Sequence, residues 1–337
     1  MKTNKPGFAQ WPGRILRRLK TETVDALTYF ILPLPALLLP WALAYRFYYR
    51  LAGRDWLFAY PSRMAAQAMA QFGITPGLPE IEAKRRFRLV LMTDIIDLWL
   101  SMLRGRWTLR RLVRQNMDWP RQRPLMVIGS HWGPGTLGLR SMRAQGLLPH
   151  FVIRPVPPEL KRSRFLFWLY RRLRSRHLNQ LLPGKRFNTG GSPRRLIQAL
   201  EGGNAILMLA DTPPQESREA VPVMLYGQPA TIHRGFSRLL ARRQIPYVTF
   251  RMGLDWRDGR RVIELQPLRQ RDNAAAIQDD LTGFVEETLW RDPGQWQLWP
   301  FTQQFLKFAA DAAEVTGGRP VAVESLPVAT VGKQSGD

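Results

Sequence analysis

The sequence has no cysteine, only four histidines, and about half as many acidic as basic residues among its 337 positions. Without cysteine there is no disulfide framework, no thiolate nucleophile and no cysteine-bound zinc. The histidines are scattered and show none of the spacings typical of a metal site; they are His131, His150, His177 and His233. We therefore expect neither a metal site nor a cofactor.

The shortage of acidic residues leaves a large positive charge. Lys and Arg total 50 against 26 Asp and Glu, which gives a formal net charge of +24. Such an excess indicates an anionic partner, which can be nucleic acid, a membrane surface or an acidic ligand. The 45% hydrophobic content is enough for one large core or two modest ones.

Charge is also absent from one stretch near the amino terminus, Ala26 to Tyr45. A stretch of this length can cross a hydrocarbon layer of roughly 30 Å. Pro33, Pro35 and Pro40 argue against a straight helix, and basic residues flank both ends, so the positive-inside rule gives no orientation. We expect a membrane anchor on the cytoplasmic face, and we favour a kinked or re-entrant segment over a single crossing.

After this segment the apolar pattern predicts an amphipathic helix over residues 79–104 and then alternating strands and helices. The pattern is typical of an α/β fold with a mostly parallel or mixed central sheet flanked by helices. We predict three regions: a basic amino terminus with its anchor (1–50), an α/β domain (51–308) and a disordered tail (309–337). The strands are expected at 125–129, 151–153, 205–209, 247–252 and 262–265, and the helices at 135–145, 159–176, 193–201, 232–243, 272–289 and 295–308.

A basic cluster extends from Arg154 to Arg195, where Glu159 is the only acidic residue. The apolar and aromatic block 165–170 lies inside it. The cluster fits a solvated helix face with a core stripe, a nucleic-acid groove with interleaved aromatics, or a surface on anionic lipid headgroups. We favour the lipid surface because the anchor lies in the same chain, and we expect no nucleic-acid partner.

His131 follows the expected strand 125–129 and precedes Trp132-Gly133-Pro134. The sheets of α/β proteins place their ligand crevice at this carboxyl edge. Imidazole is well suited to take a proton from a hydroxyl near neutral pH. A histidine that only satisfies a turn is the alternative.

The order of these pieces resembles the bacterial lipid A late acyltransferases, a branch of the glycerolipid acyltransferase superfamily, from about residue 81 to 305. His131 stands where the family's His-x-x-x-x-Asp/Glu motif begins. The other matches are Arg154-Pro155 after the next strand, Gly203-Asn204-Ala205-Ile206 leading to Asp211, the loop and helix positions Pro222, Gly227, Ala230 and Gly235, and Trp299.

The resemblance implies a membrane-associated acyltransferase of lipid A and lipopolysaccharide metabolism, at the cytoplasmic face of the bacterial inner membrane. It would move an acyl chain from acyl carrier protein or coenzyme A to a lipid or glycolipid hydroxyl, with His131 as general base. We place substrate contacts at Arg154, Lys161, Arg164 and Trp132. Arg154 would meet the oxyanion or the headgroup, or else simply belong to the basic cluster.

Two departures from the family pattern bear on this expectation. The acid of the histidine motif is replaced by Thr136, whose hydroxyl can hold the ring but does not stabilise imidazolium as a carboxylate does. Either Asp211 supplies the acid, or the chain is a degenerate homologue that binds lipid or acyl carrier protein without turnover. Trp299 is followed by Pro300 and Phe301 instead of the family's histidine and arginines, which favours a less anionic acceptor. We expect Asp94 and Asp97 on exposed helix faces.

Overall fold

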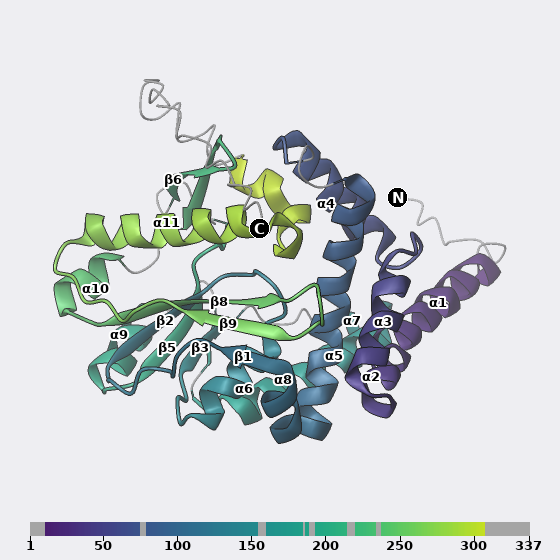
Figure 1. The fold of residues 1–337 in the computed structure, drawn as a ribbon, viewed down its shortest axis with the longest axis horizontal. Coiled ribbons are helices and arrows are strands. Elements are labelled where there is room, and N and C mark those ends of the chain that lie inside the picture. Colours follow the sequence, from purple (N-terminus) through teal and green to yellow (C-terminus); the bar gives the residue numbers. More distant parts are fainter. Residues whose placement is uncertain are drawn as a thin grey trace, which may run out of the picture.

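The computed structural model describes residues 11–74, 79–153, 160–184, 186–188, 193–213, 220–233 and 237–306. It is an α/β structure in which a mixed seven-stranded sheet carries helices on both faces (Figure 1). The fold class expected from the sequence is therefore confirmed for the sheet and its helices. The expected tail lies outside the described residues, and the division into regions stays a prediction.

The sheet has the strand order β1-β9-β8-β2-β5-β3-β4. Neighbouring strands are parallel except β8 and β9, which pair antiparallel. The strands are β1 Val113–Gln115, β2 Leu125–Gly129, β3 His150–Ile153, β4 Arg186–Asn188, β5 Ala205–Leu209, β8 Tyr247–Leu254 and β9 Arg261–Leu265; β6 Ala220–Leu225 and β7 Gln228–His233 form a separate hairpin.

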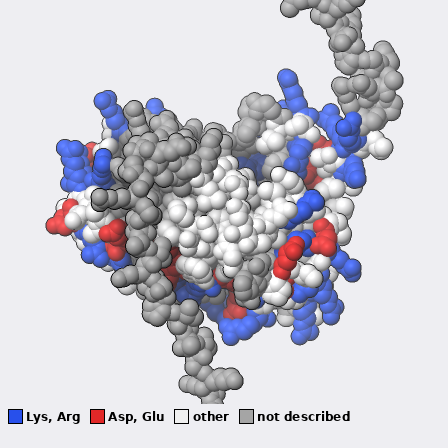
Figure 2. All heavy atoms as spheres, turned by 90° about the horizontal axis from the view of Figure 1, so that it is seen from above, with Lys and Arg blue, Asp and Glu red and all other residues white. Residues whose placement is uncertain are grey.

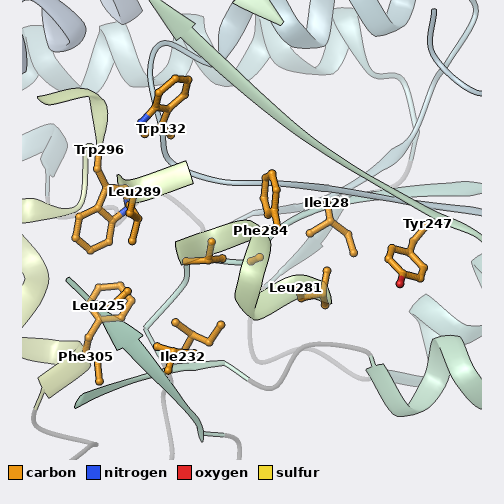
Figure 3. Close-up of a cluster of buried hydrophobic side chains, with 14 of the residues drawn as sticks. Ile128, Trp132, Leu225, Ile232, Tyr247, Leu281, Phe284, Leu289, Trp296 and Phe305 are labelled. Carbon is orange, nitrogen blue, oxygen red and sulfur yellow. The ribbon is translucent and has the colours of Figure 1, made fainter. Parts of the chain in front are cut away.

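The central strands are apolar on both faces because helices cover both. Along β2, Leu125 and Val127 join one core, and Met126 and Ile128 join the other, as the two-residue period of a strand requires. On the first face lie α6 Thr136–Ala144 and α8 Phe165–Leu181. On the second lie α9 Pro193–Glu201, α10 Ser237–Arg243 and α11 Ala274–Arg291. Figure 3 draws Leu281 and Phe284 of α11 near Ile128 of β2.

The long helix α5, Glu80–Leu112, runs beside the sheet and carries the amino-terminal helices on its outer side (Figure 1). Its backbone departs from helical geometry at Arg104. Buried side chains of α3 and α5 form one core cluster, which includes Tyr48, Leu89 and Ile96. The remaining helices are α1 Trp11–Ala26, α2 Leu34–Leu38, α3 Trp41–Ala52, α4 Ala59–Gln71 and α7 Leu160–Ser163.

The apolar stretch expected to be an anchor is broken into three pieces: a π-helical turn, Leu27–Ile31, then α2 and α3. Pro33 and Pro40 stand at the amino-terminal caps of α2 and α3. The Tyr48 hydroxyl ties the pieces together, donating to the Leu32 carbonyl at 2.8 Å and accepting from the Ala36 amide at 2.9 Å. Among the described residues, no helix combines the length and the apolar character needed to span a membrane.

Several expected elements differ from those found. Residues 232 and 233 belong to β7 and not to a helix, because Thr231 and Ile232 pair with Pro222 and Val221 of β6. The expected helix 159–176 is split into α7 and α8. In place of the expected helix 295–308, a turn leads into one short 3-10 helix, Trp299–Phe301, and only the described residues that follow, 302–306, are α-helical. Strands β1, β4, β6 and β7 were not predicted.

The expectation that Asp94 and Asp97 face solvent is wrong. Asp97 is fully buried against the equally buried Arg261 of β9, with the guanidinium Nε 3.1 Å from Oδ2. Asp94 is mostly buried and forms an ion pair with Arg174 of α8 at 2.6 Å. Both carboxylates face inward from α5 because each has an arginine partner on another element, which compensates for the loss of water.

Charge is unevenly distributed over the molecular surface. Figure 2, seen from the side of α4 and α11, shows Lys and Arg gathered at the rim and a broad area without charged side chains in the middle. Large exposed apolar side chains on these elements include Tyr60 of α4 and Trp290 of α11. On this side, therefore, an uncharged area lies between charged side chains, with Asp and Glu visible beside Lys and Arg.

Candidate functional site

His131 and Asp211 meet beyond the carboxyl ends of two adjacent parallel strands. Strands β2 and β5 pair in register, with Gly129 opposite Leu209, so the second residue after each strand lies at the same level. The Ala210 amide donates to the Gly129 carbonyl at 2.8 Å, which continues the pairing past the strand ends. The ring nitrogen Nδ1 of His131 is 2.9 Å from Asp211 Oδ1. The strand register therefore brings together two residues that are 80 positions apart.

Asp211 is fully buried and is held by three N–H groups. Besides the imidazole at Oδ1, its Oδ2 accepts from the His131 backbone amide at 2.7 Å and from the Trp296 indole at 2.9 Å. A buried carboxylate is tolerated when its oxygens are hydrogen-bonded in this way. The orientation of the Asp211 carboxylate is therefore fixed independently of the imidazole.

The loop that carries His131 is tied to a carboxyl-terminal segment, residues 295–297. Gln297 donates its backbone amide to the His131 carbonyl at 2.8 Å, and Gly133 donates to the Gln295 carbonyl at 2.8 Å. Trp132 and Trp296 form an isolated antiparallel bridge, and both rings lie at the same side of the buried cluster in Figure 3. This segment therefore supplies the Trp296 donor and also restrains the histidine loop.

The other ring nitrogen of His131, Nε2, has no hydrogen-bond partner among the described residues, and 33% of the side chain is exposed. Burial of the ring lowers the pKa of His131, but the Asp211 charge, its hydrogen bond and the more distant Asp94 outweigh burial. The pKa of His131 is therefore raised above its usual value. With the Nδ1 proton donated to Asp211, Nε2 carries a lone pair that can accept a proton from a bound molecule.

Asp94 is a second carboxylate beside the histidine loop. Its Oδ1 accepts from the Gly135 amide at 3.3 Å, while Arg174 binds its other side. The site thus contains two carboxylates. Asp211 contacts the His131 ring, and Asp94, which is paired with Arg174, contacts the loop that follows His131.

Thr136 does not hydrogen-bond to His131. It is the first residue of α6 and is buried, and its hydroxyl has no hydrogen-bond partner among the residues that the structure describes. The hydrogen bond that the threonine could have made to the ring is absent because Asp211 occupies Nδ1. Whether Thr136 has any catalytic role stays a prediction.

The other residues expected at the site lie apart from the dyad or beneath it. Trp132 is buried, with its indole donating to the Asp292 carbonyl at 2.9 Å. Arg164 forms an ion pair with Asp25 of α1, and Lys161 lies over the Trp168 ring, with Nζ 5.3 Å from its centroid. Arg154 is outside the described residues. Their substrate contacts stay predictions.

The sequence signals for Trp296 and Gln297 were weak. Both lie in a short segment without periodicity, and their hydrogen bonds span more than 80 positions. The one available signal was the concentration of tryptophan near the carboxyl end of the folded region, where Trp290, Trp296 and Trp299 follow closely. Within the described ranges, no group of three or more acidic or histidine side chains could hold a metal ion.

No protein-family model matches the sequence, and no curated protein does. Among solved structures, the chain is similar to the crystal structure of the 1-acyl-sn-glycerophosphate (LPA) acyltransferase PlsC from Thermotoga maritima. The sequences are 11% identical, the TM-score is 0.35, and the overlap covers 74% of this chain and 95% of that chain. A likeness of this size carries no argument about function, which rests instead on the residues of the site.

Proposed function

We propose that the protein is an acyltransferase that moves a fatty acyl chain from an acyl thioester to a hydroxyl of a lipid or glycolipid. The observation that carries the proposal is the His131–Asp211 pair at the carboxyl edge of the sheet, with Nε2 not bonded to any residue in the described part of the chain. The resemblance of the surrounding motifs to the lipid A late acyltransferases supports the choice of reaction. The donor would be acyl carrier protein or coenzyme A.

In this mechanism Nε2 of His131 accepts the proton of the acceptor hydroxyl as its oxygen attacks the thioester carbonyl. The tetrahedral intermediate collapses, the carbon–sulfur bond breaks, and the imidazolium returns the proton to the leaving thiolate. Asp211 keeps the Nδ1 proton in place and stabilises the imidazolium between the two steps. The products are an ester and a free thiol, so no further reactant is needed.

The direct test is transfer, or slow hydrolysis, of acyl coenzyme A and acyl carrier protein thioesters by purified protein. His131→Ala should lower the rate by about 10²–10⁴ with the fold intact, because it removes the base. His177→Gln is a matched control, since His177 hydrogen-bonds to Ser101 at 2.8 Å and belongs to the packing of α5 and α8. Wild-type transfer by the His131 variant would remove the assignment.

We also propose that the protein works at the cytoplasmic face of the bacterial inner membrane. The support is the basic composition and the apolar amino-terminal stretch, whose Leu38, Leu39 and Leu43 are exposed. Cell fractionation tests the location. Lipid profiles of cells with and without the gene, measured by mass spectrometry, would identify the acceptor and show whether it belongs to lipopolysaccharide synthesis.

The second candidate is a degenerate homologue that binds lipid or acyl carrier protein without turnover. The observation that favours it is Thr136, which stands where the family motif has an acid and whose hydroxyl is unpaired within the described ranges. Binding of acyl carrier protein or lipid, with no transfer or hydrolysis of any thioester donor, would support this candidate over the enzyme.

A further inference from the structure

A pocket lies where α3, the carboxyl end of α5 and the β8–β9 turn meet, and neither His131 nor Asp211 lines it. Its volume is about 430 Å³. Aromatic side chains and arginines dominate its lining: Trp41, Tyr45, Trp107, Arg46, Arg111, Arg257 and Arg260, with Asp258 as the one acidic residue. Below we call it the α3–α5 pocket. An apolar wall beneath a ring of arginines is suited to an amphiphile with an anionic head.

The wall of the α3–α5 pocket is fixed in place before any ligand arrives. The Trp41 indole donates to the Asp258 carbonyl at 2.8 Å, and Tyr45 donates to the Trp256 carbonyl at 2.7 Å. The buried Arg261 guanidinium stacks on the Trp41 ring, 4.4 Å from its centroid, and is itself held by Asp97. The buried ion pair therefore orients one aromatic wall of the pocket.

The β8–β9 turn approaches this wall closely at Gly259. Its φ of +69° lies in the left-handed region, and a Cβ atom there would come within 2.2 Å of the Tyr45 ring. Glycine is required for both reasons. The turn that carries Arg257 and Arg260 is thus pressed against α3.

Two of the four arginines are free to bind an anion. Arg257 and Arg260 are ion-paired with Asp255 and Asp258 of their own turn. By contrast, the structure gives Arg46 and Arg111 no hydrogen-bond or ion-pair partner among the residues it describes, and both are exposed. Two unpaired guanidinium groups at the rim of one pocket favour a phosphate, which arginine binds in a bidentate manner.

The apolar surface next to the α3–α5 pocket favours a membrane phospholipid over a soluble compound as the carrier of the phosphate. Leu38 is 75% exposed, and Leu39, Leu43 and Phe47 are also exposed, in the same stretch as the lining residues Pro40, Trp41 and Ala42. Across the pocket, Leu103 and Trp107 of α5 are exposed as well. A small soluble phosphate compound would leave these apolar side chains exposed to water, whereas a bilayer would bury them.

We propose that the α3–α5 pocket holds the phosphate of an anionic membrane phospholipid, with Leu38 and its neighbours in the acyl layer. Arg46 and Arg111 grip the headgroup, and the wall formed by Trp41, Tyr45 and Trp107 contacts the glycerol and upper acyl region. This site fixes which face of the protein meets the bilayer. It is independent of acyl transfer, since it uses none of the residues around His131.

The test is binding of the full chain to phosphatidylcholine vesicles with and without phosphatidylglycerol, measured by co-sedimentation. Arg46→Gln with Arg111→Gln should weaken binding to the anionic vesicles about 30-fold, from roughly 1 kcal/mol per basic residue near such a surface. Arg50→Gln with Arg110→Gln is the matched control, because it removes the same charge from the exposed faces of the same two helices outside the pocket. The control should lose much less; equal losses would mean diffuse attraction and would overturn the proposal.

Three further arms separate the other occupants. Leu38→Ser should weaken vesicle binding about tenfold more than the same change at the exposed Leu16 of α1. Displacement of vesicles by millimolar inorganic phosphate or glycerol phosphate would indicate a soluble ligand instead. If the Arg46/Arg111 variant lost affinity for an acidic acyl carrier protein and kept vesicle binding, a protein partner would replace the lipid. His131→Ala should bind vesicles like the wild type, so failure of the acyltransferase proposal leaves this one standing.

Discussion

The most informative single substitution is Asp211→Asn, which keeps the shape of the side chain and removes its charge. In the structure both carboxylate oxygens accept hydrogen bonds, from the imidazole, the His131 amide and the Trp296 indole. An asparagine has only one acceptor oxygen, so its NH₂ group must face at least one of these donors. The variant therefore loses the charge beside the imidazole and also part of what holds the loop.

Two consequences can be given magnitudes. Without the carboxylate, the pKa of His131 should fall by about 1 to 3, since a neighbouring opposite charge produces shifts of this size. The rate of acyl transfer should fall by about 10³–10⁴, by analogy with neutralisation of the orienting acid in serine proteases. The structure supports the analogy because Asp211 contacts Nδ1 and leaves Nε2 for substrate.

The assay is a pH–rate profile of thioester transfer. Only neutral His131 accepts a proton, so the wild-type rate should rise with pH through the raised pKa of this histidine. In the Asn variant this acid limb should move to lower pH while the plateau falls, because the carboxylate that raised the pKa is gone. A purely structural role would lower the plateau without moving the limb.

Asp272→Asn is the matched control, an exposed aspartate before α11 that lies outside the site. It should leave both the plateau and the limb unchanged. A folded Asp211→Asn protein with wild-type rate and an unshifted acid limb would refute the reasoning about the dyad.

Three other predictions follow from buried groups. Thr136→Val should change the free energy of unfolding by less than about 1 kcal/mol and leave the transfer rate unchanged, because the hydroxyl has no hydrogen-bond partner among the described residues. Thr136→Glu should destabilise the protein without raising the transfer rate. A faster glutamate variant would mean that His131 lacks a charged partner. Trp296→Phe should keep the ring packing but lower the free energy of unfolding by about 1.5–3 kcal/mol in urea titrations, since Asp211 loses a hydrogen-bond donor. Trp290 is exposed, so Trp290→Phe should leave the free energy of unfolding unchanged. Asp97→Asn should cost about 3–5 kcal/mol by leaving Arg261 buried and unpaired, and equal stability in urea would contradict the buried pair.

Much of the fold could be predicted from the sequence because its central elements have strong local signals. Strands β2 and β5 and helix α9 have the expected limits, since the strands are uninterrupted apolar runs and Pro193 marks a helix start. The strands that were missed are short, with three residues in β1 and β4 and six in β6 and β7, and a strand exists only where it pairs with a partner. The helices α1 and α4 were also not predicted. Residues 232 and 233 were expected to begin a helix but belong to β7, because pairing with β6 outweighs the local apolar periodicity.

In the candidate site, too, the sequence predicted the features that are local in the chain and left open those that depend on tertiary contacts. His131 stood out because it follows a strand and precedes a Gly/Pro turn, both of which are local features. Which residue holds the His131 ring was open between Thr136, which has the spacing of the family motif, and Asp211, which lies 80 positions away. The parallel register of β2 with β5 places Asp211 beside the ring, and the buried Thr136 hydroxyl has no partner in the part of the chain that the structure describes.

The sequence by itself determined the class of fold, the place of the histidine and the sign of the charge, because each follows from residues near one another in the chain or from composition. Only the tertiary structure decided the partners: Asp211 and Trp296 for His131, Arg174 for Asp94, Arg261 for Asp97, and the arginines that share a pocket with Trp41. The physical reason is that hydrogen bonds and ion pairs act over a few ångströms in space, and sequence separation does not limit them.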